Sequence, residues 1–179
     1  MGVVHRKNDL KCAFLNVDGL SLSTLEDVKD VIRKKQPDLV MLFETKRREE
    51  QIGLDISIDG YAVNEVKRSD TSLDKAGGGI AIYTRLVDGL IFTEYQPEIE
   101  QEQHHFVNKE RAWLKVEGAS VRTAICGAYF GCQSTDDHHA DWNSAMYETI
   151  HKEESLLRSQ GYRIVIGADF NGNVGNEEG

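Results

Sequence analysis

Oxygen-bearing side chains gather at the ends of several apolar segments of this chain, and their types suit one kind of chemistry. These residues are Asn16, Asp18, Glu44, Tyr129, Asp169 and Asn171. The set supplies hard oxygen ligands and neither Cys nor His, a composition that suits Mg²⁺, with Mn²⁺ as the alternative ion. Two carboxylates 4 Å apart repel by roughly 4 kcal/mol at an effective dielectric near 20, so acidic groups held together favour a cation. Such an ion also binds phosphate oxygens.

The end of the chain carries the densest part of this set. The β-branched run Ile164–Ile166 predicts a buried strand, and the loop after it contains Asp169 and Asn171 among glycines. In α/β folds the reactive crevice lies beyond the carboxyl ends of the strands. In an extended chain, residues i and i+2 point to the same face. Asp169 and Asn171 could therefore orient a water and a phosphate together.

Each group also has a purely structural explanation. Asp18 before Gly19 is typical of a turn, and Glu44 before Lys46 also fits the start of a solvated helix. Asp169 and Asn171 fit a turn rich in Asp and Asn, and Tyr129 fits a core tyrosine. Their joint occurrence in this order favours the chemical interpretation.

The first half of the chain predicts a strand, a helix and a strand that would position two of these groups. The strands are Lys11–Asn16 and Leu39–Phe43, the second of them buried on both faces. Between them Thr24–Lys35 has helical periodicity, with Ser23 or Thr24 as its cap and acidic residues in its first turn. This order implies a parallel pair with a right-handed crossover. Asn16 and Glu44 would therefore lie on the same rim of the sheet.

The rest of the chain alternates apolar and polar segments. The expected elements are strands Tyr61–Val66 and Ile80–Tyr83, a hairpin of Arg111–Glu117 with Val121–Gly127, and a helix over Asp136–Gln160. The acidic stretch Asp88–Gln103 predicts a weakly structured connection. Gly77-Gly78-Gly79 predicts a tight turn before a strand, because neither a helix nor Gly-Lys-Ser/Thr follows as in a phosphate-binding loop.

Composition limits the class of protein. With 179 residues and 40% hydrophobic content, the chain can bury one sizeable core. Its net charge of −9 gives no general attraction to nucleic acid or membrane, so a polyanion would need a metal or the basic loops Lys46-Arg47-Arg48 and Lys67-Arg68. Three cysteines without a short-range pair indicate a reducing compartment. No apolar run approaches the roughly 20 residues of a membrane span, so we expect an intracellular protein, cytoplasmic or nuclear.

Taken together, the motifs resemble a known superfamily. They are Asn16-Val17-Asp18-Gly19-Leu20, Glu44-Thr45-Lys46, the strand running into Tyr129, and Gly167-Ala168-Asp169-Phe170-Asn171. Their order and spacing resemble the endonuclease/exonuclease/phosphatase superfamily, most of all the apurinic-type endonuclease domains of non-LTR retrotransposons. The resemblance implies an α/β (α+β) fold, a four-layer αββα sandwich of two mixed sheets flanked by helices. It implies a tail over 1–9 and a partial domain over 10–179.

The resemblance also implies roles for the residues. A Mg²⁺ would be held by Glu44 with Asn16, and Asp18 would lie nearby. Asp169 would orient or deprotonate the attacking water, Asn171 would fix Asp169 and the phosphate, and Tyr129 would contact the phosphate or the leaving group. The reaction implied is in-line hydrolysis of a phosphodiester in DNA. A reverse transcriptase domain in a longer parent protein is a further candidate partner.

The chain departs from the superfamily pattern in ways that lead to other interpretations. Ala168 stands where a glycine is usual, and Phe130-Gly131 follows Tyr129 where a small residue and Pro are common. The final Ser-Asp-His motif of the superfamily is absent, so we expect a domain whose C-terminal part is missing and whose activity is weak or absent. One alternative is a metal-dependent phosphatase of the same superfamily. Another is a non-catalytic remnant that folds only with a partner supplying the missing strands.

Overall fold

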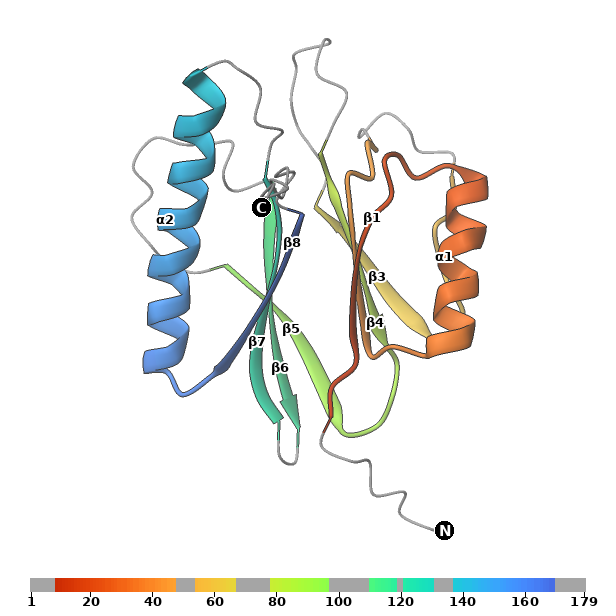
Figure 1. Cartoon of the computed structure of the whole chain (residues 1–179). Coiled ribbons are helices and arrows are strands. Elements are labelled where there is room, and N and C mark those ends of the chain that lie inside the picture. Colours follow the sequence, from red (N-terminus) through yellow and green to blue (C-terminus); the bar gives the residue numbers. More distant parts are fainter. Residues whose placement is uncertain are drawn as a thin grey trace, which may run out of the picture.

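The chain folds into two β-sheets packed face to face between two helices. The computed structural model describes residues 9–47, 54–66, 78–96, 110–118, 121–130 and 137–169, with side chains from 143 onward in the last range. Viewed along the layers, α2 covers one sheet and α1 covers the other (Figure 1). This arrangement confirms the expected αββα sandwich.

The described residues form ten elements, which make up the layers. They are β1 (Cys12–Asn16), α1 (Leu22–Lys35), β2 (Leu39–Phe43), β3 (Tyr61–Val66), β4 (Ile80–Arg85), β5 (Leu90–Tyr95), β6 (Arg111–Gly118), β7 (Val121–Tyr129), α2 (Asp137–Ser159) and β8 (Arg163–Asp169). The first sheet has the order β1-β2-β4-β3 and the second β5-β6-β7-β8. Each sheet is mixed, because β1 is parallel to β2 and β7 to β8 while the other pairs are antiparallel.

The strand pair predicted around the first helix is confirmed. Asn16 lies opposite Phe43 in the parallel register of β1 and β2, so both strands end on one rim. Every residue of β2 is buried, as its unbroken apolar sequence predicts. The rim is therefore fixed by the register of these two strands.

Helix α1 begins slightly earlier than its sequence suggests. Ser21 is the cap, accepting a hydrogen bond from the Thr24 backbone N–H at 3.1 Å, so the expected caps Ser23 and Thr24 are inside the helix. Its first turn consequently contains no acidic residue. The reason is local, since Ser21 lies one turn before Leu25, the first buried residue of the helix.

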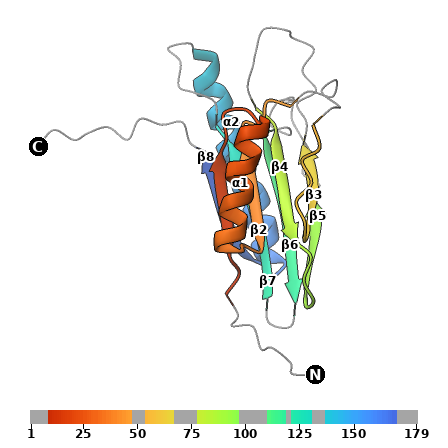
Figure 2. The same cartoon turned by 90° about the vertical axis from the view of Figure 1, so that its right-hand side faces the viewer.

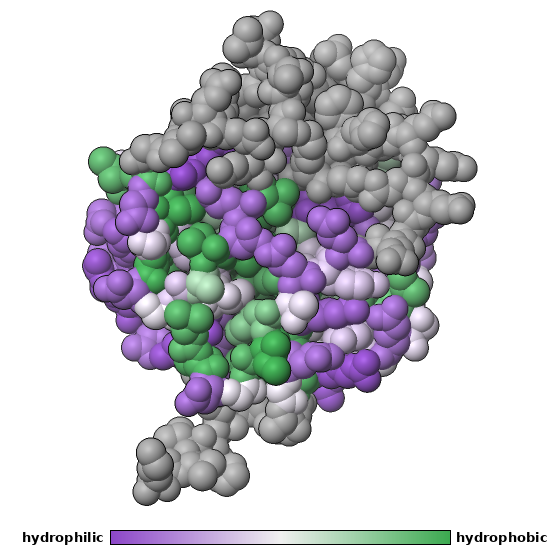
Figure 3. Space-filling view, turned by 180° about the vertical axis from the view of Figure 1, so that it is seen from behind, coloured by the Kyte–Doolittle hydropathy of each residue, from purple (hydrophilic) through white to green (hydrophobic). Residues whose placement is uncertain are grey.

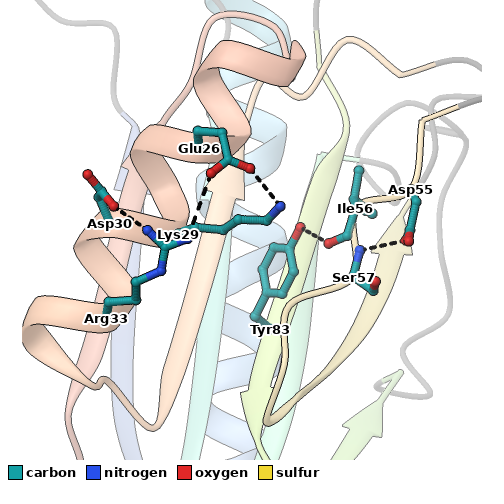
Figure 4. Close-up of polar contacts among 8 residues, drawn as sticks. All are labelled: Glu26, Lys29, Asp30, Arg33, Asp55, Ile56, Ser57 and Tyr83. Carbon is teal, nitrogen blue, oxygen red and sulfur yellow. Dashed lines mark hydrogen bonds and ion pairs between the residues drawn. The ribbon is translucent and has the colours of Figure 1, made fainter.

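The outer face of α1 carries ion pairs while its inner face packs on the sheet. Lys29 pairs with Glu26 at 2.8 Å and Arg33 with Asp30 at 2.5 Å (Figure 4). These i,i+3 pairs are solvent-exposed and contribute little stability each. On the same side of the sheet, the Tyr83 hydroxyl donates to the Ile56 carbonyl at 2.9 Å, which ties the segment before β3 to β4 (Figure 4).

The core between the two sheets is built by bulky side chains meeting a glycine. Met41, Phe43, Leu114 and Ile125 are buried in this layer. Gly127 on β7 leaves room for the β2 side chains, since a Cβ there would lie 3.2 Å from Phe43 Cε1. The two sheets therefore approach closely where β2 faces β7.

Helix α2 is held to the second sheet by a buried ion pair. Glu153 accepts two hydrogen bonds from the Arg111 guanidinium, one of them at 2.8 Å, and another from Trp113 Nε1 at 2.7 Å. Glu153 and Arg111 are both buried. A buried carboxylate is tolerated only with such complete pairing, so this contact fixes the position of the helix on the sheet.

Two expectations about strands were wrong. The stretch Asp88–Gln103 was expected to be a weakly structured connection, yet Leu90–Tyr95 forms β5, because its backbone pairs antiparallel with β6. The run Ile164–Ile166 does form a strand but is not buried. Val165 and Ile166 are 39% and 41% exposed, because β8 is an outer strand and pairs only with β7 among the described residues.

The outer strands of the two sheets lie at opposite sides of the molecule. β1 and β8 lie side by side on one side (Figures 1 and 2), and β3 and β5 are the outer strands at the opposite edges of the two sheets. The face opposite the view of Figure 1 shows several apolar groups among polar ones (Figure 3). Neither described helix combines the length and apolar character that crossing a membrane requires.

Candidate active site

The side chain of Asn16 joins the two sheets at the rim where β1 ends. Its Nδ2 donates to Glu44 Oε1 at 2.7 Å and also to Asp169 Oδ2. Glu44 follows β2 in one sheet, whereas Asp169 is the last residue of β8 in the other. The tertiary structure thus brings together three predicted residues that are as much as 153 positions apart in sequence.

Asp18 lies beside this group and is held by the turn after β1. Its backbone N–H donates to Asn16 Oδ1 at 2.8 Å, so the turn predicted at Asp18-Gly19 is present. Its carboxylate is 83% exposed and contacts the Lys46 ammonium. Asp18 therefore both forms part of a turn and lies near the site.

Lys46 is the cation of the rim. Its Nζ contacts Asp18 Oδ1 and lies 3.9 Å from Glu44 Oε2. The hydrogen bond to Asp18 raises the pKa of Lys46 above its ordinary value. An ammonium between two carboxylates offsets their mutual repulsion, as a bound metal ion would.

The backbone around the carboxylates adopts a conformation that L-residues rarely take. Asp18, Glu44 and Lys46 have φ values of 43°, 55° and 53°. Non-glycine residues with positive φ are uncommon and concentrate at functional sites, where surrounding contacts hold them. Gly19 N–H donates to the Glu44 carbonyl at 2.7 Å, so the loops after β1 and β2 hold each other in place.

Gly78 and Gly79, which precede β4, complete this support. Gly78 and Gly79 have φ values of 84° and 88°. Their carbonyls accept from the Lys46 N–H at 2.9 Å and the Thr45 N–H at 3.2 Å. The Glu44 side chain, 14% exposed, is thereby turned toward the rim rather than into the core.

Tyr129 reaches the same rim from β7. It lies opposite Asp169 in the parallel register, and it packs against the core between the sheets. Its backbone N–H donates to the Glu110 carbonyl at 2.8 Å. Its position next to Asp169 agrees with the sequence order, while Asn171 falls outside the described residues.

In the basic loop that was expected to contact phosphate, the Arg47 side chain binds other residues of the chain. Arg47 is buried, pairs with Glu65 at 2.9 Å and donates to the Leu54 carbonyl at 3.1 Å. It therefore anchors the chain before β3 instead of facing a substrate. Of the Lys46-Arg47-Arg48 run, Lys46 alone has a described side chain at the rim, since Arg48 falls outside the described residues.

The donor set fits a divalent cation in kind. Glu44 and Asp169 each accept a hydrogen bond from Asn16 through a carboxylate oxygen. Asp18 is linked to Glu44 through Lys46, whose ammonium lies near both carboxylates. Hard oxygens of this kind suit Mg²⁺ or Mn²⁺, which retain several waters and need few protein ligands. Within the described part of the chain, no three His, Cys, Asp or Glu side chains cluster as a metal site. The acidic groups that share a donor at the rim are the carboxylates of Glu44 and Asp169.

Sequence reasoning did not anticipate two residues of the rim. Lys46 was included in the Glu44-Thr45-Lys46 motif and in a basic loop, but no role beside Glu44 was expected of it. Glu110 was not singled out, and it is buried beside Gly78 and Gly79. No local pattern marks it, because its partner glycines are about 30 residues earlier.

Solved structures with a similar fold are numerous. An AP endonuclease, LMAP, from Leishmania major has a TM-score of 0.66 at 14% identity over 89% of this chain and 54% of its own. The 3′ phosphatase NExo from Neisseria, bound to a product DNA hairpin, has a TM-score of 0.58 at 17% identity, covering 94% and 60%. An endonuclease/exonuclease/phosphatase family protein from Bacteroides thetaiotaomicron has a TM-score of 0.57 at 14% identity, covering 90% and 63%.

The chain shares its fold with these structures, one of which is an endonuclease/exonuclease/phosphatase family protein. Identities this low establish the fold alone, and the chain spans 54 to 63% of the length of the three matched chains. No protein-family model and no curated protein sequence matches the chain. The four-layer fold expected from the motifs is nevertheless confirmed.

Proposed function

We propose that this chain carries the metal-binding part of a site for phosphodiester hydrolysis. The observation that supports it is the Asn16 side chain, which donates to Glu44 from one sheet and to Asp169 from the other. Carboxylates from two sheets converge only if something compensates their charge. A Mg²⁺ bound by Glu44, with Mn²⁺ as the alternative, would supply that charge and polarise a phosphoryl oxygen.

The remaining residues have distinct proposed roles. Asn16 holds the carboxylates of Glu44 and Asp169 in one orientation, so neither needs to reorganise when a substrate binds. Asp169 orients or deprotonates the attacking water, with Asn171 fixing Asp169 and the phosphate. Tyr129 contacts the phosphate or the leaving group, and Asp18 lies close enough to join the ligand set.

DNA is the proposed substrate, cut by an endonuclease of the retrotransposon type. The support is the motif order together with the similarity in fold to an AP endonuclease and to a protein bound to a DNA hairpin. A reverse transcriptase domain in a longer parent protein would be consistent with that type. The motifs, rather than the fold, carry this finer assignment.

We further propose that the site needs residues beyond these to reach full activity. The described residues give the carboxylates of Asp18, Glu44 and Asp169 at the rim, and the Ser-Asp-His motif of the superfamily is absent from the sequence. The outer edges of β1 and β8 are also unpaired among the described residues. Activity of the 179-residue chain alone should therefore be weak or absent, and a partner that adds strands at these edges would restore it.

Metal binding tests the site directly. Mn²⁺ binding to the 179-residue chain is measured by titration calorimetry for wild type, Glu44→Gln and Asp169→Asn. Both substitutions should weaken binding at least tenfold, whereas Glu26→Gln on the exposed face of α1 is the matched control and should not. Equal affinity in all variants would contradict the proposal. Robust Mg²⁺-dependent nicking of supercoiled DNA, abolished by Glu44→Ala, would contradict the proposed weakness of the chain.

A phosphatase is the second candidate function. The net charge of −9 favours a small phosphorylated substrate over DNA, and one matched structure is described as a 3′ phosphatase. Hydrolysis of plasmid DNA and of soluble phosphomonoesters should be compared in a longer protein that contains the Ser-Asp-His motif. Intact DNA together with phosphate release from monoesters would favour the phosphatase.

A further inference from the structure

Glu110 is a buried residue that contacts both halves of the rim, one through its carboxylate and the other through its backbone carbonyl. It immediately precedes β6 in the second sheet, and it is 6% exposed. Its Oε2 accepts from the Gly79 N–H of the first sheet at 3.4 Å. A long hydrogen bond contributes little energy by itself, so packing around the carboxylate must help to hold it.

Gly78 provides that packing because it has no side chain. A Cβ at position 78 would overlap the Glu110 carboxylate, lying 2.8 Å from its Cδ. The carboxylate therefore occupies the space that a side chain would fill. With φ of 84° and 88°, Gly78 and Gly79 take a conformation that other residues rarely adopt.

From Glu110, two short paths lead to the proposed site residues. On the side of the first sheet, the Gly79 carbonyl accepts from the Thr45 N–H at 3.2 Å, and Thr45 directly follows Glu44. On the other side, the Glu110 carbonyl accepts from the Tyr129 N–H at 2.8 Å, and Tyr129 pairs with Asp169. Glu110 is therefore connected to Glu44 through Gly79 and Thr45, and to Asp169 through Tyr129.

We propose that Glu110 is a positioning residue that sets the separation between Glu44 on one sheet and Asp169 on the other. The proposal rests on the proposed function in that these carboxylates form the metal-binding site. Asn16 reports this separation, because its Nδ2 reaches both carboxylates at once. If the sheets shift where Glu110 joins them, one of the two hydrogen bonds must be lost.

The test uses the Asn16 side-chain amide signals of the ¹⁵N-labelled 179-residue chain, measured without metal. Glu110→Leu removes the acceptor at similar volume, so the signal of the Asn16 amide proton that loses its hydrogen bond should shift toward the value of an exposed asparagine. Glu110→Gln keeps an acceptor and should retain the wild-type shifts. Glu153→Gln alters another buried carboxylate, on the α2 side of the same sheet, and should leave the Asn16 signals unchanged even if it lowers stability.

Mn²⁺ affinity is the second readout. Glu110→Leu should weaken binding at least tenfold, with Glu110→Gln within twofold of wild type. The proposal would be overturned if the Asn16 signals did not move in Glu110→Leu, or if Glu153→Gln shifted them equally. It would also be overturned if the Glu110→Leu chain were unfolded at 10 °C, because the carboxylate would then be required for folding itself. Because the Asn16 signals need no metal, a wild type that binds no Mn²⁺ would contradict the metal site alone.

Discussion

The carboxamide of Asn16 is suited to its position because it offers two hydrogens from one nitrogen. Glu44 and Asp169 each accept one of them, while Asn16 Oδ1 is used by the Asp18 N–H. An aspartate at this position would place a third carboxylate against the other two. The residue type therefore follows from the two acceptors that meet there.

Asn16→Ala should weaken Mn²⁺ binding by about 10- to 100-fold, the range typical of residues that orient metal ligands. The cause is loss of the shared donor, after which the two carboxylates repel each other and reorient. Titration calorimetry measures the affinity, and Asn64→Ala on β3 is the control. An unchanged dissociation constant in Asn16→Ala would contradict the proposed bridging role.

Two thiols have been removed from water in the folded chain. Burial raises the pKa of Cys12 to about 11, with Asp38 adding to the effect, and raises the pKa of Cys126 further. The ordinary value for both is 9.0. The folded state therefore keeps protons that the unfolded state loses as pH rises past about 9.

The free energy of unfolding should consequently be constant with respect to these thiols below pH 9 and fall as pH rises from 9 toward 11. Each thiol can contribute a slope of at most about 1.4 kcal/mol per pH unit. Urea unfolding at pH 8 and pH 10.5 with a reducing agent measures the loss, which Cys126→Ala should reduce. Equal stability at both pH values would show that the thiols titrate normally.

At the scale of elements, α2 depends on one polar contact in an apolar interface. Met146, Ile150 and Leu157 are buried against the second sheet. Among them Glu153 is also buried, paired with Arg111 and Trp113. Such a pair adds little net stability over apolar side chains, but losing one partner leaves a charge uncompensated.

Arg111→Leu should therefore lower the free energy of unfolding by about 3 to 5 kcal/mol. The matched control is Arg158→Ala, which removes an exposed i,i+4 pair with Glu154 on the same helix and should cost less than about 0.5 kcal/mol. Urea denaturation of both variants supplies the comparison. Similar losses in the two would mean that Glu153 does not need its partner.

At the scale of the whole molecule, one side of the sandwich ends in two outer strands that have no further neighbouring strand among the described residues. β1 and β8 lie next to each other there, and Gly167 on β8 packs against the Phe14 ring. Val165 and Ile166 are partly exposed on β8. An apolar outer strand with free backbone groups is a site for pairing with another chain.

The 179-residue chain should self-associate through this edge as its concentration rises. Ile166→Lys should shift the equilibrium toward monomer, because a charged side chain on an outer strand disfavours pairing. Sedimentation velocity over a range of concentrations measures the shift, with Ile91→Lys on the outer strand β5 as the control. A monodisperse monomer in wild type would count against both this prediction and a remnant that requires a partner.

The sequence by itself determined most of the local structure. The unbroken apolar run of β2 predicted burial on both faces, and the strand, helix and strand around it predicted the parallel pair that places Asn16 and Glu44 on one rim. These features follow from residue spacing, which depends on neighbours along the chain. The motif order likewise predicted the four-layer αββα fold.

Only the tertiary structure decided how the halves meet. The run Ile164–Ile166 is partly exposed because its strand lies at the edge of a sheet, which its own sequence does not indicate. Likewise, β5 forms because it pairs with β6. The contact of Asn16 with Asp169 and the reach of Glu110 to Gly79 join segments far apart in sequence. Local periodicity carries no information about such contacts, because they arise from the packing of one sheet on the other.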